Sequence, residues 1–111
     1  MGDFADIVVL ITTASAEEAQ RIASLLLNER KAACINILSG VSSRFWWQGK
    51  LESAEESLLI VKTKASVLNQ IVSLVKAHHS YKVPEIIALP IIGGNEDYLR
   101  WLDKEVKEKG G

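Results

Sequence analysis

Strand-like and helix-like segments alternate along this chain in an order that few folds accommodate. Residues 7–13 are apolar or β-branched at every position, which is typical of a buried strand. Apolar residues then recur at helical spacing over residues 19–27 and again over residues 68–75. Strand-like segments cover residues 32–47, 50–63 and 86–92, and Asn95 is placed to cap a C-terminal helix. The predicted order is βαββαβ plus a terminal helix.

Local signals mark where these elements begin and turn. Ser15 stands three residues before Glu18, the spacing of a capping box, so we expect the first helix to start there. Gly40 predicts a break or bulge in the second strand. Gln48-Gly49 predicts the tip of a long hairpin, and Glu55-Glu56 are expected on its solvated face.

The element order is that of the ferredoxin-like, split βαβ arrangement, in which helices cover one face of a four-stranded sheet. The sequence therefore predicts an α+β protein with a single domain over residues 1–111. Phe45, Trp46 and Trp47 hold consecutive strand positions, so large aromatic rings point to both sides of the sheet. Exposed apolar area on that scale usually marks an interface, and we expect a homo-oligomer. The alternative is that the two tryptophans fill a large core.

Charge and cysteine content exclude several classes of function. Lys and Arg number 13 against 14 Asp and Glu, which leaves no electrostatic footprint for nucleic acid or for an acidic membrane. No apolar run reaches the roughly 18 residues of a membrane helix, and the acidic N-terminus does not resemble a signal peptide. Cys34 stands alone, with nothing adjacent to activate it, and is expected to be a small buried hydrophobe. We therefore expect a cytoplasmic protein.

His78 and His79 are adjacent at the end of the second predicted helix. Imidazole suits Cu, Zn and Ni, so the pair is a candidate partial metal site. Neighbours in a helix diverge by about 100°, however, so one ion cannot bind both unless the helix has ended or another subunit adds a ligand. The alternative is an ordinary helix C-terminus, where the helix dipole favours a cation.

Four segments together resemble a known family. They are LITT over residues 10–13, ERKAACINI over 29–37, the hairpin SRFWWQGKL over 43–51 with LIVKT over 59–63, and HSYKVPEIIALP over 79–90. Residues 94–95 and 98–102 (GN and YLRWL) continue the match. In this combination and order the chain is similar to CutA, the divalent-cation tolerance protein family.

The resemblance implies a tight homotrimer built like the PII signalling proteins, with no enzymatic reaction firmly attached to it. It implies tolerance of copper and other divalent cations, with His78 and His79 as the corresponding metal ligands. Ile11 stands where the family's copper assignment places a first-strand cysteine. We therefore expect copper or another divalent cation to bind weakly. No organic cofactor is expected, and the partner beyond the trimer is an unidentified protein or small molecule.

The resemblance also implies a cleft between subunits. It gathers there Thr12, Trp47, Lys62, Tyr81 and Glu85, with His79 close by. Cationic, acidic and aromatic groups that converge on an apolar cleft can hold a small polar ligand. The alternative is that Lys62, which interrupts an apolar strand, forms a buried ion pair with Glu85 that fixes the subunit register.

Three functions remain open on this basis. The first is a non-catalytic, metal-responsive trimer, and the second is a PII-like module that binds a small polar ligand in intersubunit clefts. The third is a hydrolase or isomerase built around Lys62, Glu85 and His79. Catalysis has little support, because the sequence has no nucleophile elbow, phosphate-binding glycine loop or complete zinc signature.

Overall fold

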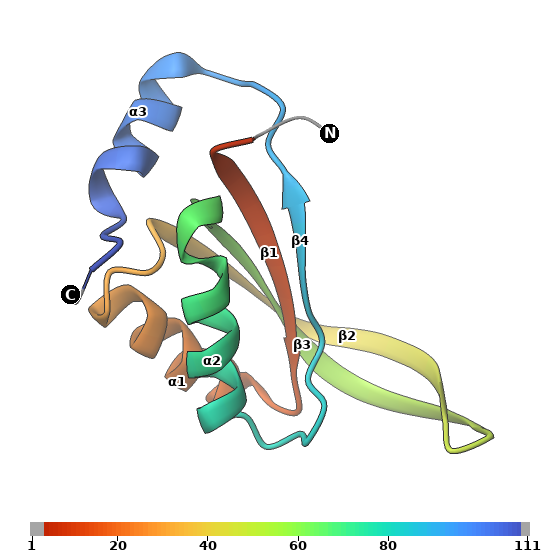
Figure 1. Ribbon diagram of the computed structural model, residues 1–111. Helices are drawn as coiled ribbons and strands as arrows, with labels where there is room; N and C mark the ends of the chain where they lie inside the picture. The colour runs from red at the N-terminus through yellow and green to blue at the C-terminus, as the bar shows by residue number, and fades with distance from the viewer. Residues whose placement is uncertain (1–3, 110–111) are drawn as a thin grey trace.

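The computed structural model describes residues 4–109 and shows a four-stranded antiparallel sheet with helices packed on one face (Figure 1). The first three residues, part of the acidic N-terminal stretch, and the last two lie outside the described range. The elements are β1 Asp6–Thr13, α1 Ala16–Asn28, β2 Cys34–Trp47, β3 Lys50–Lys64, a 3-10 turn Ala65–Val67, α2 Leu68–His78, β4 Ile86–Pro90 and α3 Glu96–Glu105. The strand order is β2-β3-β1-β4. The predicted α+β, ferredoxin-like fold is confirmed.

Both predicted helix starts are capped by the expected side chains. Ser15 Oγ accepts a hydrogen bond of 3.1 Å from the backbone N–H of Glu18. The Glu18 carboxylate turns back to the N–H of Ala14 at 3.0 Å, one residue before the position that a capping box uses. Asn95 Oδ1 accepts from the N–H of Asp97 at 3.0 Å and starts α3.

A long hairpin arm extends from the sheet beyond the helices (Figure 1). The register between β2 and β3 shifts between Leu38 and Val41, where Gly40 has a φ of 73°. This confirms the predicted bulge. At the tip, Gln48 and Gly49 have φ values of 51° and 78°, so both residues adopt the left-handed conformation that a type I′ hairpin turn requires.

The core lies between the sheet and the helices. Alternate residues of β1 and β3 face α1 and α2 and are buried with apolar residues of both helices. The fully or nearly fully buried set includes Ile7, Val9, Ile11, Leu59, Val61, Ala19, Ile22, Leu26, Ile71 and Val75. Within one chain, β1 is therefore covered by helices on only one of its two apolar faces.

The second face of the sheet is apolar and carries no helix. Leu10 and Ile60 face each other across β1 and β3 and are only half-buried. Leu38, Ile87 and Leu89 are exposed at 45%, 51% and 48% on the flanking strands. We call this surface, which also includes Val8 and Leu58, the open face.

The aromatic side chains of the hairpin arm lie outside the core. Trp46 is 72% exposed, and Phe45 and Trp47 are also exposed. The alternative in which the two tryptophans fill a large core is therefore wrong, because the arm extends past the helices that would have covered them (Figure 1).

An acidic contact lies where α3 packs against the start of β1. Asp6 is only 8% exposed, and its Oδ1 atom is buried without a hydrogen-bond partner in the described residues. Burial raises the pKa of Asp6 from 3.8 to about 6, and a hydrogen bond and charge repulsion from Asp103 add to the rise, whereas Lys64 opposes it. The fold thus favours the protonated form of this carboxyl group.

We expect the pH dependence of stability to change in Asp6→Asn. A raised pKa stabilises the folded protein fully below pH 3.8, and this stabilisation is lost as the pH rises through about 6. The stability of the variant relative to the parent, measured by urea unfolding, should therefore rise between pH 3.8 and about pH 6 and stay constant above that. Asp103→Asn, which removes only the neighbouring carboxylate, should show part of the gain. Parallel pH curves for Asp6→Asn and the parent would contradict the assignment.

Candidate functional site

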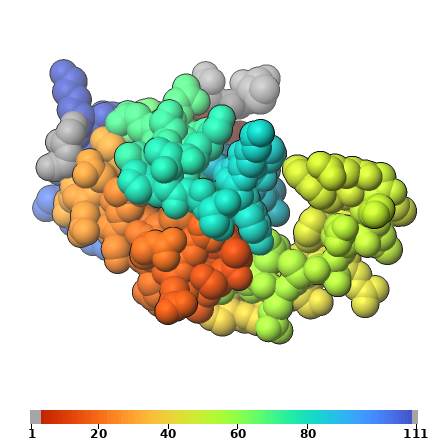
Figure 2. All heavy atoms as spheres, turned by 90° about the horizontal axis from the view of Figure 1, so that it is seen from below, coloured from red at the N-terminus to blue at the C-terminus, as the bar shows by residue number. Residues whose placement is uncertain are grey.

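A cavity of about 690 Å³ lies between the hairpin arm and the loop that joins α2 to β4. Figure 2 shows the corresponding hollow between the yellow-green arm and the cyan segment. Four of the residues predicted for the cleft line it: Thr12, Trp47, Tyr81 and Glu85. Phe45 and Glu56 also line it and were not predicted to do so. We call this cavity the arm pocket.

Glu18 holds the α2–β4 loop against the start of α1. Its carboxylate is 3% exposed and accepts from the N–H of Ser80 at 2.6 Å and from Ser80 Oγ at 3.0 Å, in addition to the Ala14 N–H. Burial disfavours the charged form, but the hydrogen bonds from Ala14 and Ser80 and the nearby His79 outweigh it and lower the pKa of Glu18. The sequence pattern predicts only a capping role for Glu18.

The side chain of His79 is fully buried and uses both ring nitrogens. The backbone N–H of Tyr81 donates to Nδ1 at 2.9 Å, so the proton of the neutral ring lies on Nε2. Nε2 in turn donates to the carbonyl oxygen of Thr12 at 2.7 Å. Metal coordination by either nitrogen requires one of these hydrogen bonds to break. The ring positions Tyr81, whose own ring centroid lies 4.9 Å away.

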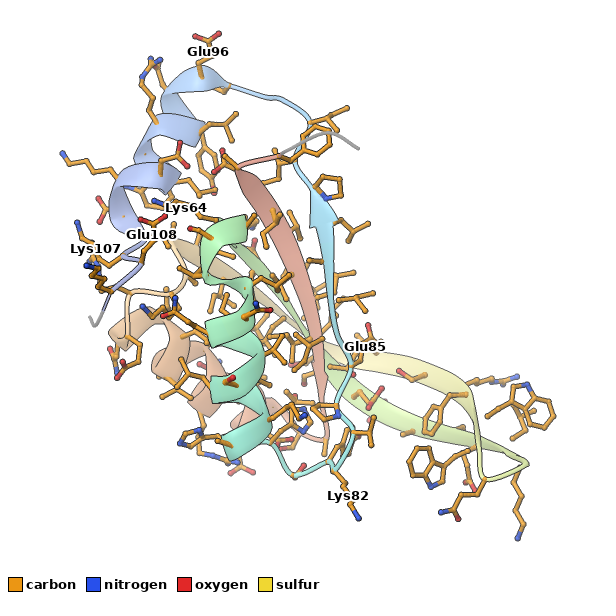
Figure 3. All side chains as sticks on the ribbon, in the orientation of Figure 1. Lys64, Lys82, Glu85, Glu96, Lys107 and Glu108 are labelled. Atoms are coloured by element: carbon orange, nitrogen blue, oxygen red, sulfur yellow. The ribbon has the colours of Figure 1, made fainter. Side chains whose placement is uncertain are left out.

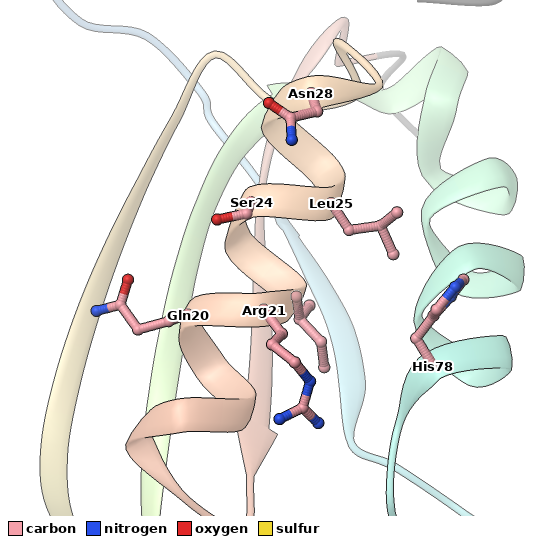
Figure 4. Close-up of a pocket in the computed structure, with 7 residues that line it drawn as sticks. Gln20, Arg21, Ser24, Leu25, Asn28 and His78 are labelled. Carbon is pink, nitrogen blue, oxygen red and sulfur yellow. The ribbon is translucent and has the colours of Figure 1, made fainter.

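His78 lies on a different surface. Its Nδ1 atom is 2.9 Å from the carbonyl oxygen of Leu74, one turn earlier in α2, and the side chain lines a groove of about 540 Å³ between α1 and α2. Figure 4 shows His78 across this groove from Arg21 and Leu25. The structure therefore does not bring His78 and His79 together. Among residues 4–109, no group of three or more His, Cys, Asp or Glu side chains is arranged to hold a metal ion.

Glu56 and Tyr81 form the polar centre of the arm pocket. Tyr81 Oη donates to Glu56 Oε2 at 2.7 Å, and Glu56 is only 7% exposed. Burial, the hydrogen bond to Glu56 and the charges of Glu56 and Glu18 raise the pKa of Tyr81 to about 12, so the phenol keeps its proton and donates. The expectation that Glu56 lies on a solvated face is wrong. The strand period places Glu56 in phase with the open-face residues Leu58 and Ile60, and its burial comes from the distant Tyr81, which the period does not reveal.

Lys62 lies apart from the arm pocket. It is half-buried on the open face, opposite Val8 on one side and Cys34 on the other. Ile86, the neighbour of Glu85, pairs with Ile11, which is three residues or about 10 Å further along β1 than Val8.

Among the described residues of one chain, Lys62 and Glu85 form no ion pair, and a pair that fixes the register between subunits stays a prediction. Because Lys62 lies apart from the arm pocket, the residues considered for a hydrolase or isomerase, Lys62, Glu85 and His79, do not meet at one site in the chain.

The helices of the described range give no candidate for a membrane span, since none combines the necessary length with the necessary apolar character.

Solved structures of the same fold are similar over nearly the whole chain. The divalent cation tolerance protein of Thermus thermophilus superposes with a TM-score of 0.90 and 47% sequence identity, over 92% of this chain and 99% of that one. CutA1 from Oryza sativa superposes with a TM-score of 0.92 and 45% identity, over 96% and 97% of the two chains.

Sequence relatives carry the same name. The Thermus thermophilus divalent-cation tolerance protein CutA is 50% identical over 95 residues, which are 86% of this chain and 92% of that protein. The chloroplastic CutA 1 of Oryza sativa is 47% identical over 92% of this chain, although this chain spans only 58% of that protein and 56% of its Arabidopsis thaliana relative. The family model of the CutA1 divalent ion tolerance protein matches residues 7–105, and the chain belongs to this family.

Proposed function

We propose that this protein is a non-catalytic homotrimer that responds to divalent cations and binds copper or another divalent cation weakly. The observation that carries the proposal is the open face, where Leu10, Leu38, Ile60, Ile87 and Leu89 leave a sheet surface without cover. Apolar area of this extent favours association with further copies of the chain. Membership in a family named for divalent cation tolerance supports the response to metal.

Weak metal binding is consistent with the histidine geometry. His78 is exposed, and its contact with Leu74 occupies Nδ1 and leaves Nε2 available. One imidazole is a single ligand, whereas a stable site needs three or four, so the other ligands must come from water or another subunit. A cytoplasmic location belongs to the same proposal. The names of relatives place two in the chloroplast and one in the periplasm, so the compartment is not common to the family.

Native mass spectrometry with and without Cu²⁺, Zn²⁺ and Cd²⁺ tests this proposal. We expect the mass of three chains, with metal adducts that are lost in His78→Ala while the trimer persists. Gln20→Ala is the matched control, because Gln20 lines the same groove without an imidazole (Figure 4). A monomeric parent protein would refute the assembly. Equal adducts in His78→Ala and the parent would refute the role of His78.

A second candidate function is the binding of a small polar ligand in a PII-like manner. The arm pocket supports it, because Thr12, Trp47, Tyr81 and Glu85 converge on one cavity and two carboxylates accompany aromatic rings there. This candidate does not depend on metal binding.

A further inference from the structure

The carboxylate of Glu56 is buried with little compensation for its charge. Tyr81 Oη is the one side-chain donor that reaches it, and no lysine, arginine or histidine of residues 4–109 forms an ion pair with it. Removing a carboxylate from water is costly unless a cation or several donors replace the lost hydration. Glu56 lines the arm pocket. A cation that enters this pocket would therefore reach a carboxylate that has no cationic partner among the described residues.

The walls of the arm pocket also favour a cation with an apolar body. Phe45, Trp47 and Tyr81 line the same cavity as Glu56, and aromatic rings attract cations over their faces. Glu85 adds a second carboxylate.

Two basic residues, Arg44 and Lys82, also contribute to the lining, but both are exposed, whereas Glu56 is buried. Lys82 points away from the body of the molecule (Figure 3). Phe45, Trp47 and Glu85 are exposed as well. The buried centre of the pocket is therefore Glu56 together with the half-buried Tyr81.

We propose that the arm pocket binds a small primary alkylammonium ion. Its N–H groups donate to Glu56, and its alkyl part packs on the rings of Trp47 and Tyr81. Tyr81 orients the carboxylate by donating to Oε2 and leaves the other oxygen for the ligand. A cavity of about 690 Å³ admits ligands larger than a short amine. This inference rests on the second candidate function, binding in the arm pocket, and adds the chemical class of the ligand.

An NMR titration of the ¹⁵N-labelled full chain with n-butylammonium chloride tests the proposal. We expect shifts of the Trp47 indole N–H and the Tyr81 amide, both at the pocket. n-Butanol, which has the same shape without the charge, and sodium chloride at equal ionic strength should leave them unchanged. Glu56→Gln keeps the shape of the side chain and an acceptor for Tyr81. It should weaken binding at least about ten-fold, because hydrogen bonds to charged groups contribute more than neutral ones.

Glu55→Gln is the matched control, since Glu55 is the exposed neighbour of Glu56 on the same strand and should bind n-butylammonium as the parent does. Absence of shifts in the parent, or equal affinity in Glu56→Gln, would overturn the proposal. A drop of the Glu56→Gln protein to a smaller assembly would also overturn it, because the carboxylate would then pair with another subunit.

Sodium n-butyrate separates this inference from the function on which it rests. Binding of butyrate instead of n-butylammonium would keep the arm pocket as a ligand site and refute the ligand class. Binding of n-butylammonium by a protein that takes up no metal would refute the metal proposal and leave this one intact.

Discussion

Replacing Ile60 with aspartate is expected to convert the proposed trimer into monomers. Ile60 lies near the middle of the open face, between Leu10 of β1 and Asn36 of β2. In an assembly buried through this face, the new carboxylate would lose its water without gaining a partner, at a cost of about 3–5 kcal/mol per subunit. That cost lowers an association constant by a factor of a hundred or more. In the separated chain the same residue is only half-buried, so the fold should survive.

Light scattering after size-exclusion chromatography measures the assembly state, and far-UV circular dichroism checks that the variant is folded. Ser24→Asp is the control, because it places the same charge on the exposed side of α1, away from the open face. A folded Ile60→Asp protein that keeps the parent's mass would show that the open face is not the interface.

Glu18→Ala is expected to cause the largest loss of stability among the polar substitutions. The carboxylate receives hydrogen bonds from Ala14 N, Ser80 N and Ser80 Oγ, and it joins the start of α1 to the α2–β4 loop. Removal leaves these donors without an acceptor, and the free energy of unfolding should fall by about 3 kcal/mol. The neighbouring Glu17 is exposed, and Glu17→Ala should change it by no more than about 0.5 kcal/mol.

The pH dependence of this loss identifies the ionised carboxylate as its cause. Because the pKa of Glu18 is lowered in the folded protein, its stabilisation is present above the unfolded pKa and is lost as the pH falls through the folded value. The difference in free energy of unfolding between Glu18→Ala and the parent, measured with urea, should therefore be largest near pH 7 and smaller in acid. A difference of the same size at both ends of the pH range would mean that Glu18 acts through packing and not through its charge.

The same network connects stability to the arm pocket. Glu18 accepts from Ser80, and His79 donates to Thr12 while its Nδ1 atom positions Tyr81. The loop that carries Tyr81 is thus attached to the body of the protein at two points. The opposite wall comes from the hairpin arm, which depends on the bulge at Gly40 and the turn at Gln48 for its course. The pocket is therefore formed within one chain, while the open face is the surface through which we propose that copies associate.

Several features of the fold could be predicted because their causes are local. The Ser15 cap, the Gly40 bulge and the Gln48-Gly49 turn each depend on residues within a few positions of one another. The strand and helix periods also depend only on residues close in sequence. Together with the element order they predict the ferredoxin-like fold and its uncovered face.

The predicted cleft between subunits can be compared only with the cavity of the single chain. Thr12, Trp47, Tyr81 and Glu85 do line one cavity, whereas Lys62 lies further along the sheet and does not. The resemblance to the family groups these positions without showing which chain each comes from or how far along the strands it lies. Lys62 pairs with Val8, whereas the neighbour of Glu85 pairs with Ile11, and this shift of three residues along β1 separates the two side chains.

By itself the sequence determined the order of the elements, their caps and turns, and the family, because these depend on short-range patterns and on matched segments. Only the tertiary structure decided that Glu56 is buried against Tyr81, 25 residues away, and that His79 donates to Thr12, 67 residues away. The burial of a charge and the position of an imidazole proton depend on which distant groups surround them. Those neighbours are brought together only when the sheet, the arm and the loop fold against one another.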